Sequence, residues 1–220
     1  MASHAGARSG AGELLADRAY VQLRDQIVTL ALPPGAPINE ELLGRELQMG
    51  RTPLREAIKR LALENLISVY PRRGTFVTEI NITDLAHVSD VRVQLEGHAA
   101  YRAAQRLTPA LRGELDELVA AVERPDERDD AEALMRLDAD VHRFIYRCAG
   151  NPYLRETLER YLNLSLRIWY LALARLPHLA ERVREHGDLL AAVRDGDAER
   201  ARAIAEDHVA RFEDEIRGVL

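Results

Sequence analysis

The 220-residue sequence contains a single cysteine, Cys148, so no disulfide can form within the chain. A chain without disulfides suits a reducing compartment. Long hydrophobic runs are also lacking: the longest, residues 168–174, is far shorter than the roughly 20 residues that a membrane-spanning helix needs. Residues 1–12 contain no apolar segment of the kind found in secretory signals. We therefore expect a soluble, cytoplasmic protein with no membrane partner.

An overall excess of positive charge is lacking as well, because the formal net charge is −6. The charge is unevenly distributed: residues 1–80 carry ten basic and nine acidic side chains, whereas residues 81–220 carry twenty and twenty-seven. Within residues 51–73 there are six basic side chains and two acidic ones. A local basic patch on an otherwise acidic protein indicates phosphate binding. A solvated helix face would produce the same cluster.

After a flexible segment at 1–12, the first third of the chain predicts three helices and a β-hairpin. Apolar residues at helical spacing predict a helix over 13–31, which Pro33-Pro34-Gly35 ends. Asn39 is suited to cap a short second helix. A tight turn at Gln48-Met49-Gly50 separates that helix from a third, and two β-prone runs, 67–70 and 75–77, form the hairpin.

The third helix has one apolar and one basic face. Thr52 is expected to be its N-cap, and Pro53 its first helical residue. Such a helix can enter the major groove of DNA, where arginine suits guanine edges and lysine or threonine suits phosphates. The inward stripe is Leu54, Ala57, Ile58 and Leu61, and the outward residues are Arg51, Thr52, Arg55 and Lys59.

The hairpin tip, Arg72-Arg73-Gly74, is suited to lie along or enter a minor groove. A small domain of three helices and a hairpin without any DNA role fits the spacing too.

Two motifs together resemble the DNA-binding domain of GntR-family transcription regulators. They are RTPLREAI followed by Arg60-Leu61, and PRRGTFV at 71–77. The resemblance covers residues 13–78 and implies a winged helix-turn-helix bound to a double-stranded DNA operator. It also implies that DNA is contacted by Arg51, Thr52, Arg55 and the Arg73-Gly74 wing tip. Gly50 stands where this family usually has serine or threonine, and acidic Glu40 and Glu41 stand where some members have basic groups.

Residues 79–83 predict a linker, and no strand pattern follows it. The remaining segment, 84–220, predicts an antiparallel all-α bundle of about six helices, so the fold class is mainly α. The expected helices cover roughly 84–106, 110–123, 129–149, 152–175, 178–194 and 197–219.

Three of these helices each place a histidine on an apolar stripe. Asp138 and His142 lie one turn apart, and His186 and His208 occupy similar positions in two later helices. Burying titratable groups is costly unless they pair or bind something. Any one of these histidines alone fits a core residue bonded to a carbonyl, but the four residues together favour a divalent metal. Zinc is the first choice, and nickel, manganese and iron also suit this ligand set.

The stretch from Asp138 to His142, followed by AGNPYL at 149–154, is similar to the FCD effector domain of FadR-like GntR regulators. Val141 replaces the usual phenylalanine, and His186 and His208 fit the same pattern. The resemblance implies that these four residues are the metal ligands and that a small organic acid occupies open coordination positions. The six-helix count resembles the VanR-type subgroup more than the seven-helix FadR type.

Three further residues are candidates for binding the carboxylate effector. Arg92 can pair with an anion, and Asn163 and Arg167, one turn apart, can line the same cavity. Surface or inter-helix salt bridges explain each of them equally well.

The sequence thus indicates a homodimeric transcription regulator, expected to be a repressor, whose operator binding responds to an organic acid. A constitutive DNA-binding regulator with a purely structural metal remains an alternative. A metal-dependent enzyme is a weaker one, because the sequence has no HExxH motif and Asp140, the nearest carboxylate, points off the stripe of His142.

Overall fold

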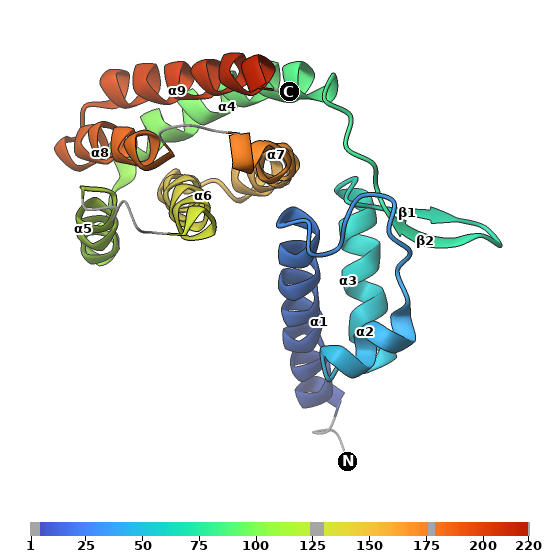
Figure 1. Cartoon of the computed structure of the whole chain (residues 1–220). Coiled ribbons are helices and arrows are strands. Elements are labelled where there is room, and N and C mark those ends of the chain that lie inside the picture. The colour runs from blue at the N-terminus through green and yellow to red at the C-terminus, as the bar shows by residue number, and fades with distance from the viewer. Residues whose placement is uncertain (1–4, 124–129, 176–178, 220) are drawn as a thin grey trace. The chain divides into compact units, whose positions relative to one another are not determined.

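The structure is a computed structural model that describes residues 5–123, 130–175 and 179–219 (Figure 1). It divides into two compact units, Met1–Asn81 and Ile82–Leu220, called here the N-terminal and C-terminal units. The division falls within the segment 79–83 that the sequence predicts as a linker.

The N-terminal unit is built around two helices that pack side by side, α1 (Ala5–Val28) and α3 (Arg51–Leu63). A short helix, α2 (Glu40–Glu46), packs against α3. Asn39 caps α2, because its side chain accepts hydrogen bonds from two backbone amides. Each helix buries one face, and the apolar side chains at helical spacing on these faces form the core of the N-terminal unit. Its members include Tyr20, Leu23, Ile27, Leu43, Leu54, Ala57, Ile58 and Leu61.

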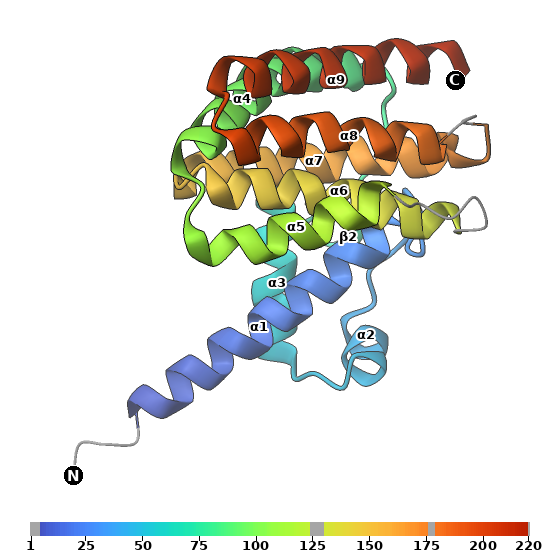
Figure 2. The same ribbon diagram turned by 90° about the vertical axis from the view of Figure 1, so that its left-hand side faces the viewer.

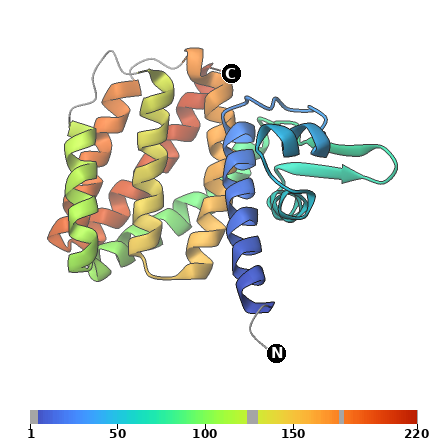
Figure 3. The same ribbon diagram turned by 90° about the horizontal axis from the view of Figure 1, so that it is seen from below.

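A two-stranded antiparallel hairpin completes this unit (Figure 3). Strands β1 (Ile67–Tyr70) and β2 (Gly74–Val77) pair with Ile67 opposite Val77. Segment 35–38 bonds to the other edge of β2, so that edge is not left unpaired. The predicted winged helix-turn-helix arrangement is confirmed.

Two local predictions in this unit are wrong. Helix α3 begins at Arg51 with Gly50 as its N-cap, so Thr52 is inside the helix and does not cap it. Gly50 is extended and offers no side chain, yet its carbonyl accepts the amide of Leu54, which closes the first turn. The expected flexible segment 1–12 is helical from Ala5 onward, and no proline interrupts α1 there. Residues 1–4 lie outside the described residues.

The C-terminal unit is an antiparallel bundle whose successive helices run in alternating directions (Figure 2). Helix α4 contacts α6, α7, α8 and α9, and it packs most extensively on α9. The prediction of six helices is confirmed for the described residues, with a short 3-10 turn, Leu173–Arg175, continuing α7. The predicted breaks at 125–129 and at Leu176-Pro177 lie outside those residues. The helices are α4 (Asp84–Arg106), α5 (Pro109–Glu123), α6 (Ala131–Cys148), α7 (Pro152–Ala172), α8 (Leu179–Asp195) and α9 (Ala198–Val219).

Within the described residues, we find no helix that combines the length and the apolar character needed to cross a bilayer.

Candidate functional site

Helix α3 presents a basic face to solvent. The predicted DNA-contacting residues Arg51, Thr52, Arg55 and Lys59 are all exposed, whereas the apolar stripe on the opposite side is buried. The four exposed residues span two turns of one helix, which is the geometry that a major-groove reader requires.

Two of these basic side chains are already paired with carboxylates. Nε of Arg55 donates to Oε2 of Glu40 on α2 at 2.8 Å, and Nζ of Lys59 lies 3.2 Å from Oε1 of Glu56. Exposed ion pairs of this kind contribute little to stability. The side chains of Arg55 and Lys59 can therefore leave their carboxylate partners and bind a phosphate or a base edge of DNA.

The hairpin turn holds its two arginines away from the N-terminal unit's core. Arg72 and Gly74 adopt left-handed backbone conformations, with φ of 63° and 113°. The backbone N–H of Arg73 donates to the carbonyl of Tyr70 at 3.1 Å and closes the turn. Arg72, Arg73 and Gly74 are exposed, so the tip can reach a DNA backbone.

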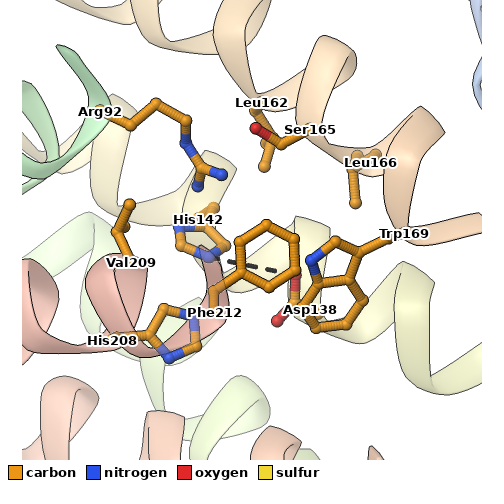
Figure 4. Close-up of a pocket in the computed structure, with 10 residues that line it drawn as sticks. All are labelled: Arg92, Asp138, His142, Leu162, Ser165, Leu166, Trp169, His208, Val209 and Phe212. Atoms are coloured by element: carbon orange, nitrogen blue, oxygen red, sulfur yellow. Dashed lines mark ion pairs between the residues drawn. The ribbon is translucent and has the colours of Figure 1, made fainter. Parts of the chain in front are cut away.

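In the C-terminal unit, three helices bring the four predicted metal ligands together. Asp138 and His142 come from α6, His186 from α8 and His208 from α9. One potential ligand atom from each residue lies within 4.8 Å of the others. Figure 4 shows three of the four side chains, with the ion pair between His142 and Asp138 dashed.

The hydrogen bonding of His186 fits a bound cation. Its Nδ1 lies 3.3 Å from the carbonyl oxygen of Val183, which can only accept, so this contact favours the tautomer that carries its proton on Nδ1. In the neutral ring Nε2 is then a bare lone pair, and it faces Oδ1 of Asp138 at 3.4 Å. Both atoms are buried and neither has a hydrogen-bond partner. Two ligands of a single divalent ion can be this far apart, since each lies about 2.0–2.2 Å from the metal.

The pKa shifts of two of the three histidines suit metal binding. Burial lowers the pKa of His186, and burial together with the neighbouring His186 and His142 lowers that of His208, so both rings are neutral and can act as ligands. Burial also lowers the pKa of His142, but the carboxylates of Glu96 and Asp138 together outweigh burial and raise it overall. Arg92 balances one of the two buried carboxylates, Glu96 and Asp138. The other requires a proton on His142 or a cation.

A small cavity of about 10 Å³ adjoins these ligands, enough for roughly one water molecule. Arg92 and Ser165 contribute its polar wall, and stacked Trp169 and Phe212, with ring centroids 4.6 Å apart, contribute part of its apolar wall (Figure 4). The complete lining is Arg92, Asp138, His142, Leu162, Ser165, Leu166, Trp169, His208, Val209 and Phe212.

The expectation that Asn163 and Arg167 line this cavity is wrong. Both are buried on α7, but the α7 residues that face the cavity are a neighbouring stripe, Leu162, Ser165, Leu166 and Trp169. Consecutive residues on a helix differ by about 100° in direction. The predicted pair therefore lies on an adjacent face of α7, and of the three predicted effector residues only Arg92 lines the cavity.

Sequence reasoning also missed a hydrogen-bonded group behind His142. Nδ1 of His142 lies 3.1 Å from Oε2 of Glu96, and the hydroxyl of Tyr146 donates to Oε1 of Glu96 at 2.6 Å. Arg92 donates to the same Oε1 through Nε and Nη2, at 3.1 and 2.5 Å. The available signal was the Arg-Glu pair one turn apart on α4, on a face otherwise filled by small residues.

Each of the two units matches a known protein family. The description "Bacterial regulatory proteins, gntR family" matches residues 15–77, and "FCD domain" matches residues 87–211. The chain belongs to the GntR family of transcription regulators. As a GntR regulator with an FCD domain it is a DNA-binding protein and not an enzyme.

Individual relatives of this GntR regulator extend over most of the chain. It is 32% identical over 182 residues to the transcriptional regulator McbR of Escherichia coli (strain K12), covering 82% of each chain. It is 28% identical over 203 residues to the transcriptional repressor RspR of the same strain, covering 91% of this chain and 88% of RspR. The solved structure of E. coli McbR/YncC is similar with a TM-score of 0.78 at 28% identity, over 93% of this chain and 97% of that one.

Proposed function

We propose that this regulator is a repressor whose operator binding is modulated by a small carboxylic acid bound beside a divalent metal in the C-terminal unit. The observation that carries the metal is the convergence of one ligand atom from each of four residues within 4.8 Å, with Nε2 of His186 and Oδ1 of Asp138 buried 3.4 Å apart and without a hydrogen-bond partner. A buried contact between two acceptors is unfavourable unless a proton or a cation lies between them, and burial disfavours the protonated form of His186.

Asp138, His142, His186 and His208 would hold the metal, with zinc as the first choice and nickel, manganese or iron as the others. When bound, the metal supplies a positive charge and open coordination positions to which a carboxylate can bind. The chain itself positions the acid: the guanidinium of Arg92 lines the polar side of the cavity, and the unpartnered buried hydroxyl of Ser165 faces the same space.

The cavity limits what can bind without a conformational change. Its volume of about 10 Å³ takes one water-sized group, so any larger acid must displace part of the wall. Of that wall, the stacked rings of Trp169 and Phe212 present the largest side chains, on α7 and α9. Movement of these helices is the step by which an effector would favour one conformation, because an effector shifts an equilibrium only through a difference in affinity between two states.

On the DNA side, we propose that Arg51, Thr52, Arg55 and Lys59 enter the major groove and that Arg72, Arg73 and Gly74 contact the backbone or minor groove. The fold presents one reading helix per chain, and helix-turn-helix proteins commonly bind two half-sites as dimers. We therefore propose a homodimer that acts where the DNA is, in the cytoplasm. The repressor assignment is supported by similarity to proteins described as repressors, RspR among them.

A thermal-shift screen of small carboxylic acids, with and without chelator, tests this function. We expect at least one acid to raise the midpoint of unfolding of the metal-loaded protein and to lose that effect after chelation. A ligand at 100 times its Kd stabilises the native state by about 2.7 kcal/mol, which is readily detected.

A constitutive regulator with a structural metal is the alternative. It predicts that chelation lowers the unfolding midpoint while no acid raises it. Stabilisation by an acid that is unaffected by chelation would contradict an effector site at the metal.

A further inference from the structure

Two of the candidate ligands, His186 and His142, differ in the group that contacts Nδ1 of the ring. His186 is backed by the neutral carbonyl of Val183, at 3.3 Å from its Nδ1. His142 is backed instead by a charged carboxylate, Oε2 of Glu96, at 3.1 Å. A carboxylate behind a histidine fixes its orientation and makes the other ring nitrogen a stronger donor to a metal.

Glu96 is itself held in place by two further groups. Its Oε1 accepts from the hydroxyl of Tyr146, on the same helix as His142, and from the guanidinium of Arg92, one turn earlier on α4. Glu96, Arg92 and Tyr146 are at most 4% exposed. Both oxygens of the carboxylate are therefore engaged by fixed partners, and Glu96 has no solvent to reorient into.

We infer that Glu96, held by Arg92 and Tyr146, is the positioning residue that orients His142 and makes it a stronger nitrogen ligand of the metal centre than His186. Glu96 does not line the cavity and would act on a bound metal through His142. This role rests on the metal site of the proposed function. It also gives Arg92 a role besides that of lining the cavity, since the side chain neutralises a carboxylate that would otherwise be buried alone.

The test measures the affinity of the purified full chain for Zn²⁺ by competition with a chelator, and the visible absorption of the Co²⁺-loaded protein. Removing Glu96 alone would leave the charge of Arg92 buried and unpaired, which endangers folding. The informative variants are therefore Arg92→Gln with Glu96→Gln, which removes both charges together, and Tyr146→Phe, which removes one hydrogen bond and no charge.

We expect the double variant to bind Zn²⁺ about 10 to 100 times more weakly, as found when outer-shell partners are removed, and to shift the Co²⁺ spectrum. We expect Tyr146→Phe to weaken binding by a smaller factor in the same direction. Ser89→Ala is the matched control: it removes a buried hydroxyl without a hydrogen-bond partner from α4, the helix of Arg92 and Glu96, does not alter the cavity lining, and should leave the affinity unchanged.

The possible results distinguish the role of Glu96 from the metal site of the proposed function. If the wild type binds metal and the folded variants match it in affinity and spectrum, the role of Glu96 is overturned while the metal site stands. If the double variant does not fold, an unchanged affinity in Tyr146→Phe overturns the inference by itself. If the wild type binds neither Zn²⁺ nor Co²⁺, the metal site fails and this inference fails with it.

Discussion

Replacing Arg51 and Arg55 together by alanine is expected to abolish specific operator binding and to leave the fold intact. Both side chains are exposed on one face of α3, and neither contributes to the core of the N-terminal unit. Each good bidentate contact between a side chain and a base contributes about 1–3 kcal/mol of discrimination. Two such contacts correspond to a loss of roughly 30-fold or more in affinity.

The measurement is fluorescence anisotropy with an operator selected from random-sequence DNA by the wild-type protein. Arg184→Ala with Arg194→Ala is a matched control, because it removes the same charge from exposed positions on α8. If the α3 variant binds as tightly as this control, the assignment of α3 as the DNA-reading helix is wrong.

Replacing His186 and His208 by alanine is the change expected to have the largest effect on the C-terminal unit. It removes two of four ligands drawn from separate helices, α8 and α9. Because Asp138 and His142 both come from α6, the metal would no longer link the three helices. We expect elemental analysis to show the bound metal falling from about one ion per chain to a trace.

The matched control for this change is His87→Ala with His98→Ala, which removes two exposed histidines from α4. It should retain full metal content. Full occupancy in His186→Ala with His208→Ala would show that the ligand set is different from the one proposed.

Helical periodicity and motif spacing were sufficient to predict most of the fold. The α3 stripe of Leu54, Ala57, Ile58 and Leu61 is buried as its spacing predicts, and six helices follow the linker in the part of the chain that the structure describes. Helix ends were less predictable, because capping depends on backbone geometry that composition does not fix. Gly50 shows this: it occupies the N-cap of α3 with no capping side chain, while the sequence pointed to Thr52.

The candidate site, too, could be predicted only in part from the sequence. Asp138 and His142 could be paired from their one-turn spacing, but Glu96 reaches His142 and Tyr146 across 46 and 50 residues of sequence. Only the packing of α4 on α6 brings these residues together. Asn163 and Arg167 were expected to line the cavity and do not. Helical spacing shows that two residues share a face of the helix, but it does not show which face lies against the cavity.

The central claim, that an acid bound at the metal controls DNA binding, is tested most directly by one titration. Affinity for the selected operator is measured for the metal-loaded protein as the acid identified by thermal shift is added, and again after chelation. We expect the acid to change operator affinity by about 5- to 150-fold, the usual range of allosteric coupling, and chelation to remove the effect. An operator affinity that is the same with and without the acid would contradict it.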